Sequence, residues 1–315
     1  MTGRGSSIVQ RSSVALRFWI GPRVLHLLPR NIGYRTAAGL ARRRFRSRRS
    51  QLALRIGEIE SLLGADRDTV ERWLERAFES GASEQLDVSV HHRMTQQNVT
   101  RFGQVEGAEH LQWARRQGRG AILVSGHVYG LFTFFVALAL RGLRVNMLTL
   151  PPNREPAAFR GFQRRRFEYL TDQLGIRPLS IETSNFAVAV QARNALSRNE
   201  LVTIVIDQSS SKPLVEVDFL SGRALFPLGP ALLAQASGAP LLPFWIHRPD
   251  GWRPQIAEIG EPLFVEADLE AAVARCAAWL EGRILADPPS WSLWLNPNYE
   301  LPTPVGEAVG RALVE

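Results

Sequence analysis

Short apolar runs alternate with helix-like stretches from about residue 105 onward, and this alternation limits the fold more than any other feature of the chain. Each run has the length of a buried strand and is bounded by glycine, proline or polar residues. The predicted strands lie at 121–124, 145–150, 201–206 and 240–246, and the predicted helices at 108–117, 131–140, 160–174, 184–197, 230–237 and 266–287. Strands joined through helices pair in parallel. The pattern therefore predicts an α/β fold with a mostly parallel central sheet flanked by helices.

The chain is predicted to have three consecutive parts. Residues 1–12 are polar and are expected to form a flexible N-terminus. Residues 13–105 are expected to form an N-terminal helical region, in which Asp68 has the sequence context of an N-cap. Residues 106–305 are expected to form the α/β part. No linker, internal repeat or low-complexity block interrupts the sequence from 30 to 305, so the helices and the α/β part are predicted to be one continuous domain.

Two features of the helical region suggest that it binds an anionic membrane surface. Residues 13–28 mix large apolar side chains with arginines, which suits an amphipathic element lying on a membrane or in a groove of a partner. Residues 41–49 contain six arginines. These arginines form either a solvated helix face or a patch that holds the protein against anionic lipid. The apolar segment just before them favours the second interpretation, in which 13–105 faces the membrane.

The chain is basic, with a formal net charge of +8, and all but one of its 38 basic residues are arginine. The abundance of alanine and arginine points to genomic base composition as the main cause. A basic surface nevertheless attracts acidic partners, whether an anionic membrane, a phosphorylated substrate, an acidic carrier protein or nucleic acid. The charge alone does not decide among them.

Cysteine usage and hydropathy bear on the location of the protein. Cys276 is the only cysteine, so no disulfide can form within the chain, and its alanine-rich surroundings indicate a packed core thiol. No run reaches the roughly 18–20 apolar residues of a spanning helix, and the first residues lack the order of a signal peptide. We therefore expect the mature protein to begin near residue 1 and to be cytoplasmic, peripheral at the inner face of the cell membrane.

Two chemically useful side chains follow predicted strands. His127 stands just after the run at 121–124, and Asp207 directly follows the run at 201–206. Ligands of open α/β sheets bind outside the carboxyl ends of the strands, where a histidine can act as a general base. If both strands are central and parallel, His127 and Asp207 lie at the same edge of one sheet.

Several kinds of site are excluded by the motifs that the sequence lacks. It has no Gly-x-Ser-x-Gly nucleophile elbow. Lys212, the lone lysine, is not in a phosphate-binding loop, and the glycines of 118–120 precede their strand, so neither marks a nucleotide site. His91 and His92 are adjacent and diverge on any regular element, and no other spacing resembles a metal site. A nucleic-acid role would rest on charge alone. We expect neither a metal nor a cofactor.

The chain resembles the glycerolipid and lipid A acyltransferases of the lysophospholipid acyltransferase superfamily. Within it, the sequence is most similar to the bacterial lauroyl and myristoyl acyltransferases of lipid A assembly and to the phosphatidylinositol mannoside acyltransferases of actinobacteria. The resemblance runs nearly end to end, and the stretch 215–243 is its most specific part. Its other parts are Leu27-Leu28-Pro29, Gly107-Ala108-Glu109-His110-Leu111, Ile122-Leu123-Val124-Ser125-Gly126-His127, Asp207-Gln208 and the segment from Pro289 to Trp294.

This resemblance implies an enzyme that moves an acyl group from a thioester of acyl carrier protein or coenzyme A to a membrane-associated acceptor. In the family, a histidine deprotonates the acceptor, and a carboxylate five residues later orients that histidine. His127 matches the histidine, but the carboxylate position is Phe132, or Thr133 if one residue is inserted before it. Neither side chain can carry the charge. No serine or cysteine nucleophile is evident, so the acceptor would attack the thioester directly.

Three interpretations of the missing carboxylate remain open. Another acid replaces it, and Asp207 is the candidate because it follows the next functional strand. Alternatively, the acceptor is an amine, which needs a weaker base than a hydroxyl does. Finally, the chain is a non-catalytic acyl- or lipid-binding accessory protein of the same fold. The first two describe an atypical acyltransferase of lipid or natural-product biosynthesis.

Five further residues are candidates for substrate binding. The resemblance implies basic residues near the donor or acceptor after the second strand and in the loop beyond Gly222. Tyr129 is close to His127 in sequence, and Gln208 follows Asp207. The candidates are Arg154, Arg164, Arg223, Tyr129 and Gln208. The tryptophans Trp279, Trp291 and Trp294 are expected to be core residues. Acceptor identity, acyl length and oligomeric state are not predicted.

Overall fold

The computed structural model describes residues 21–149, 164, 167–180, 185–208 and 212–304. The predicted flexible N-terminus, the first part of the segment 13–28, and Arg154 lie outside the described residues.

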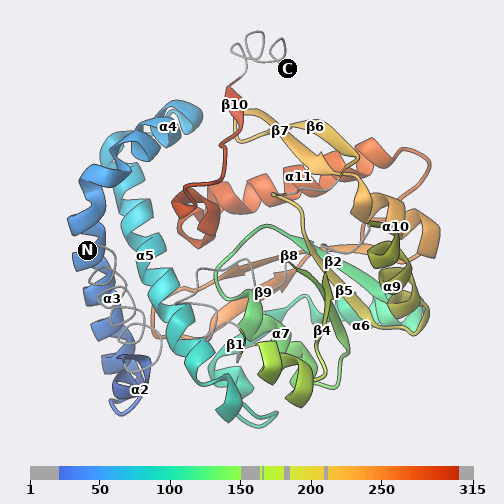
Figure 1. Cartoon of the computed structure of the whole chain (residues 1–315), viewed down its shortest axis with the longest axis horizontal. Coiled ribbons are helices and arrows are strands. Elements are labelled where there is room, and N and C mark those ends of the chain that lie inside the picture. The colour runs from blue at the N-terminus through green and yellow to red at the C-terminus, as the bar shows by residue number, and fades with distance from the viewer. Residues whose placement is uncertain (1–20, 150–163, 165–166, 181–184, 209–211, 305–315) are drawn as a thin grey trace, which may run out of the picture.

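A seven-stranded sheet forms the centre of the fold, in the order β1-β9-β8-β2-β5-β3-β4 (Figure 1). The strands from β8 to β4 in that order pair in parallel, whereas β9 is antiparallel to β8 and parallel to β1. The predicted mostly parallel sheet is therefore confirmed. Its strands are β1 (Gly103–Glu106), β2 (Ala121–Ser125), β3 (Val145–Thr149), β4 (Arg177–Ser180), β5 (Leu201–Val205), β8 (Leu241–His247) and β9 (Gln255–Ile259).

Helices cover both faces of this sheet. Figure 1 shows α7 on one face and α11 on the other, and β2 between them is buried along its whole length. Burial on both faces explains why the central strands read as continuous apolar runs. These helices are α6 (Ala108–Arg116), α7 (Leu131–Leu140), α9 (Asn185–Ser197), α10 (Gly229–Ser237) and α11 (Leu269–Ala286). Of the predicted helix at 160–174, the described end is a π turn, Tyr169–Gln173.

In the described residues four α-helices precede the sheet, and α3 and α5 run side by side along one flank of the molecule (Figure 1). They are α2 (Gly21–Leu25), α3 (Arg30–Arg48), α4 (Ala53–Leu63) and α5 (Arg67–Ser89). The predicted N-cap of α5 at Asp68 is wrong by two residues. Asp66 is the cap, because its side chain accepts a hydrogen bond from the backbone N–H of Thr69. Within the described residues, every helix is too short or too polar to cross a membrane.

The arginine-rich run 41–49 is divided between two environments. Part of the run faces α5, where a row of glutamates meets it. Its pairs with α5 are Arg42 with Glu79 at 2.9 Å, Arg46 with Glu75 at 3.6 Å, and Arg49 with Glu71 at 2.6 Å. The side chains of these three arginines remain 43, 71 and 56 % exposed, and those of Arg43 and Arg48 are exposed as well. Solvent-exposed ion pairs with α5 therefore engage three of the six arginines.

A buried carboxylate ties the helical region to the sheet. Asp87 near the end of α5 is fully buried and accepts hydrogen bonds from the hydroxyl of Tyr34 on α3 and from Nη2 of Arg248, just beyond β8. Arg30 at the start of α3 donates from Nε to the carbonyl of Trp252 at 2.9 Å. Buried charges are tolerated when they are paired and hydrogen-bonded. This cluster therefore fixes α3 and α5 against the loop that joins β8 to β9.

A smaller antiparallel sheet, absent from the elements that the sequence predicts, packs against α11. Its strands are β6 (Leu214–Phe219), β7 (Gly222–Pro227) and β10 (Thr303–Pro304), in the order β10-β7-β6. Leu220 and Ser221 form the two-residue turn with φ of 52° and 61°, the left-handed conformation that tight hairpins need. Two 3₁₀ turns, η7 (Pro288–Ser290) and η8 (Ser292–Leu295), follow α11 and lead back toward the end of β2.

Candidate active site

His127 and Asp207 come together at the carboxyl edge of the sheet. In the parallel pairing of β2 with β5, Ser125 is opposite Val205, and each functional residue stands two positions beyond. The Nδ1 atom of His127 lies 2.6 Å from Oδ1 of Asp207. The expectation that both side chains lie at one edge of the sheet is therefore confirmed. The catalytic roles of these two residues stay predictions.

Three hydrogen bonds converge on the carboxylate of Asp207. Oδ1 is bound to Nδ1 of His127, while Oδ2 accepts from the backbone N–H of His127 at 2.6 Å and from Nε1–H of Trp291 at 2.7 Å. The side chain of Asp207 has no solvent exposure. A buried carboxylate with three such partners is held in one orientation, because any rotation would leave a donor unpaired.

Gly126 is required between strand and histidine because the carboxylate comes so close to it. A Cβ atom at this position would lie 2.6 Å from Oδ2 of Asp207 and 3.1 Å from a methyl carbon of Leu280 on α11. Both neighbours are buried. Only glycine therefore allows His127 to bind Asp207 through its backbone and its ring at once.

The imidazole of His127 is tuned toward a stronger base. Burial lowers the pKa of the ring, but the charge of Asp207 and the hydrogen bond to it raise the pKa, and the net result is a value above the usual 6.5. About a third of the side chain, 32 %, remains exposed. The ring is thus supported by a buried carboxylate on one side and open on another.

The hydrogen-bond pattern assigns the tautomer of His127. An ionised carboxylate only accepts, so the Nδ1 atom that faces Asp207 carries the proton and Nε2 carries the lone pair. Nε2 has no hydrogen-bond partner among the residues that the structure describes. The site therefore offers a free basic nitrogen, which is the arrangement that general base catalysis requires.

The two residues at the position of the missing carboxylate have other roles. Phe132 on α7 packs edge-on against Phe135 and Phe167. Thr133 is fully buried, and its hydroxyl lies 3.0 Å from Nε2 of His91. His91 is thus a buried structural histidine, and among the described residues no hydrogen bond joins Phe132 or Thr133 to His127.

The segment after α11 supports the backbone around His127. Ser292 donates from its backbone N–H at 2.8 Å and from its hydroxyl at 2.7 Å to the carbonyl of His127. Val128 and Trp291 form an antiparallel bridge, and Tyr129 donates its N–H to the carbonyl of Ser290. This segment comes more than 160 residues later in the chain, and it acts as a short added strand beside the histidine.

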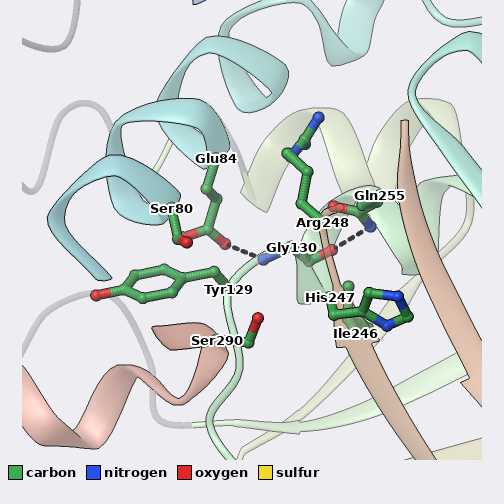
Figure 2. A pocket seen from close by; sticks show the side chains of 9 residues that line it. All are labelled: Ser80, Glu84, Tyr129, Gly130, Ile246, His247, Arg248, Gln255 and Ser290. Atoms are coloured by element: carbon green, nitrogen blue, oxygen red, sulfur yellow. Dashed lines mark hydrogen bonds between the residues drawn. The ribbon is translucent and has the colours of Figure 1, made fainter. Parts of the chain in front are cut away.

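The next residues of the loop are held from two sides. Gly130 donates its N–H to Oε1 of Glu84 on α5 at 3.1 Å, and its carbonyl accepts from Nε2 of Gln255 on β9 at 2.9 Å, as Figure 2 shows. Gly130 has a φ of 94°, and a Cβ there would lie 2.2 Å from Oε1 of Gln255. The loop that follows His127 is therefore bound by the helical region as well as by the sheet.

The described residues among those predicted to bind substrate lie in several different places, and their binding role stays a prediction. Tyr129 lines a small pocket with Ser80 and Glu84, and its ring lies against Gly81 of α5 (Figure 2). The other candidates lie on exposed surface or outside the described part. Arg164 is paired with Glu168, Arg223 is paired with Glu216 and Asp218 on the neighbouring strand, Gln208 is exposed beside Asp207, and Arg154 is not described.

A cysteine nucleophile and a metal site find no support in the described residues. Cys276 is buried in α11, and burial raises the pKa of its thiol to about 12, so the thiol stays protonated at neutral pH. In the described part of the chain, no group of three histidine, cysteine or carboxylate side chains could hold a metal ion.

Sequence reasoning did not assign a functional role to Trp291, Ser292 or Gly126. Trp291 is indeed a core residue, being fully buried, but its indole N–H reaches Asp207 as well. The signal that could have marked it is its place inside the segment 289–294, one of the parts that carry the resemblance. Only a fold that brings this segment to the histidine shows what it does.

Comparison with known proteins supports the resemblance. A family model described as bacterial lipid A biosynthesis acyltransferase matches residues 9–300 of the chain, which is most of its 315 residues. No curated protein matches the chain significantly.

Proposed function

Because the chain belongs to the bacterial lipid A biosynthesis acyltransferase family, we propose that it moves an acyl group from a thioester to a hydroxyl or amine acceptor, with His127 as general base. The observation that carries this proposal is the bond between Nδ1 of His127 and buried Asp207, which leaves Nε2 basic and unpaired among the described residues. The donor is acyl carrier protein or coenzyme A, and no cofactor is needed.

The reaction proceeds by direct attack. Nε2 of His127 takes the proton of the acceptor hydroxyl or amine as the acceptor oxygen or nitrogen bonds to the thioester carbonyl carbon. The carbon–sulfur bond then breaks, and the imidazolium returns its proton to the departing thiolate. Asp207 remains ionised throughout, orients the ring and stabilises the imidazolium, as the carboxylate does in other histidine-based hydrolases and transferases.

Asp207 takes the place of the carboxylate that the motif lacks. Among the described residues, its charge is the one that raises the pKa of His127, and its two oxygens bind both the ring and the backbone of that residue. A carboxylate from a neighbouring strand can perform the orienting task because that task depends on position at Nδ1 and not on spacing along the chain.

Acyl transfer is tested with purified protein, acyl carrier protein thioesters and acyl-coenzyme A in separate reactions. The acceptors are a lipid A precursor, a phospholipid and a small amine, and intact-mass spectrometry follows loss of acyl from the donor and gain on the acceptor. We expect transfer by the wild type and by the exposed-surface control His92→Gln, and loss of transfer in His127→Gln. Transfer that survives His127→Gln would refute base catalysis.

The alternative, a non-catalytic binding protein, predicts a different result in the same reactions. Acyl ligand would then be retained by both the wild type and His127→Gln, and no acceptor would gain mass. This pattern would replace the proposed acyltransferase with an accessory protein of the same fold.

We propose in addition that the helical region faces an anionic membrane. Leu27 and Ile32, with exposures of 85 % and 48 %, project from the start of this region, and exposed arginines such as Arg43 lie on α3. Apolar side chains and arginines together bind anionic lipid. Flotation with phosphatidylglycerol vesicles should recover the wild type and lose Leu27→Ser/Ile32→Ser, whereas Leu225→Ser, which removes an exposed leucine of β7, should still float. Equal flotation of all three proteins would contradict this orientation.

A further inference from the structure

Trp291 makes the one side-chain hydrogen bond to the carboxylate of Asp207 that comes from the described part of the segment after α11. Its Nε1–H donates to Oδ2 of Asp207 at 2.7 Å, whereas the imidazole of His127 faces Oδ1. Asp207 has no exposure, so water cannot take the place of this donor. The indole therefore completes the solvation of a charge that the reaction needs.

The indole is fixed in place by aromatic packing and by its backbone. Trp291 is fully buried, and its ring meets Phe219, Trp294 and Tyr299 edge-on, with ring centroids 6.1, 4.5 and 5.4 Å away. Its backbone bridges to Val128, and the next residue, Ser292, binds the carbonyl of His127. The same short segment thus positions both partners of the pair.

We propose that Trp291 is a positioning residue that holds the carboxylate of Asp207 turned toward His127, and thereby sets the basicity of the His127 imidazole. This inference rests on the proposed function, because it concerns the base of that reaction. Beyond the proposed function, the inference is that the Trp291 N–H, together with the Asp207 carboxylate, sets the base strength of His127.

The direction of the effect follows from the charge on Asp207. A donor on Oδ2 withdraws part of the negative charge that attracts a proton to the imidazole. Loss of the donor strengthens that attraction at His127. It therefore raises the pH at which the imidazole gains a proton, and a protonated imidazole cannot accept the proton of the acceptor.

Few other charged groups act on the pair from the elements around it. Tyr299 packs edge-on against the Trp291 ring, and burial and the charge of Asp207 both raise the pKa of its phenol, so it stays neutral. Arg55 of α4 binds the carbonyl of Tyr299. Asp287 is bound by the hydroxyl of Ser290 at the start of the segment. A variant that leaves these groups in place reports on the indole N–H alone.

Trp291→Phe removes the N–H and keeps an aromatic ring, and Trp294→Phe is its matched control. Trp294 is buried in the same cluster, but its Nε1–H donates to the carbonyl of Pro288 at 3.0 Å and does not reach Asp207. Both variants lose one buried indole and one hydrogen bond. A merely structural effect should therefore appear equally in the two, and an effect on the pair only in Trp291→Phe.

The primary readout is the titration of the His127 ring by NMR on histidine-labelled protein without substrates, with the signal assigned by its loss in His127→Gln. We expect the midpoint to rise by about one pH unit in Trp291→Phe, as for loss of a hydrogen bond to a charged group, and to remain unchanged in Trp294→Phe. An unchanged midpoint in Trp291→Phe, or equal shifts in both variants, would overturn the inference.

The acidic limb of the pH–rate profile for acyl transfer is the second readout, and it should move upward by the same amount. The NMR titration needs no turnover. Absence of acyl transfer would therefore count against the proposed function, while the titration would still test the role of Trp291. If Trp291→Phe does not fold, as judged by circular dichroism, replacement of Trp291 with 3-benzothienylalanine removes the N–H from a ring of nearly the same shape. The same shift is then expected, and its absence overturns the inference.

Discussion

Replacing Asp207 with asparagine should abolish acyl transfer by reversing the tautomer of His127. An asparagine side chain has one accepting oxygen and one NH₂ group, but the carboxylate that it replaces accepts three N–H donors. Two of those donors, from the His127 backbone and Trp291, share Oδ2. The amide therefore satisfies most donors when its oxygen takes the place of Oδ2 and its NH₂ takes the place of Oδ1.

In that orientation the NH₂ of the new side chain faces Nδ1 of His127. Nδ1 must then accept, so the proton moves to Nε2, which is the nitrogen that the proposed mechanism needs unprotonated. In a histidine-based protease, the corresponding change lowers kcat by about 10⁴-fold through the wrong tautomer, and we expect a loss of this order here. Removal of a charged acceptor from a buried hydrogen-bond network also costs about 1–3 kcal/mol of unfolding free energy.

The assay combines rate, tautomer and stability for Asp207→Asn. Acyl transfer is followed by intact-mass spectrometry, the tautomer by the two ¹⁵N shifts of the His127 ring, and the unfolding free energy by urea denaturation. Asp250→Asn, a change in an exposed loop residue whose carboxylate pairs only with nearby Arg253 among the described residues, is the control. A variant Asp207→Asn that folds and retains more than a tenth of the wild-type rate would refute the orienting role of this carboxylate.

Three further predictions follow from the same geometry. Since His127 acts unprotonated and its pKa is raised above 6.5, the rate of acyl transfer should fall as pH drops through a midpoint above 6.5. The same raised pKa stabilises the folded protein below about pH 6.5, and this contribution is lost as pH rises through the pKa of the folded state. Urea denaturation at several pH values would show this loss. Gly126→Ala would place a methyl group 2.6 Å from Oδ2 of Asp207, so kcat should fall at least about 100-fold, as for other small misplacements of catalytic groups; a normal rate would show that the loop can move. Asp87→Asn leaves Arg248 buried without its charge partner and should lower the unfolding free energy by about 3–5 kcal/mol, whereas a loss under 1 kcal/mol would mean that this cluster does not anchor the helical region.

The strands and helices of the α/β part follow closely from local sequence pattern. The predicted helix at 131–140 matches α7 residue for residue, and the predicted strand at 121–124 differs from β2 only at Ser125. Such segments are buried on both faces or amphipathic, so their composition alone indicates their type. The strands β1, β4, β6, β7 and β9 lie at sheet edges or in hairpins and alternate or mix apolar with polar residues, which is why the sequence does not indicate them.

The arginine-rich run shows where local pattern is insufficient. Six arginines in nine residues are compatible with a solvated helix face and with a lipid-binding patch, and three of them form solvent-exposed ion pairs with glutamates of α5. Which arginines find such partners depends on how the helices pack, and packing depends on residues far away in the chain.

The sequence by itself determined that His127 and Asp207 each follow a short apolar strand, and that the two residues share one edge of the sheet if both strands are central and parallel. Only the tertiary structure decided that the carboxylate reaches the imidazole, that Phe132 and Thr133 face elsewhere, and that Trp291 donates to Asp207 from 84 residues away. The physical reason is that strand pairing is set by periodic patterns within a few residues, whereas the donors around a buried charge are set by which distant segments pack beside it.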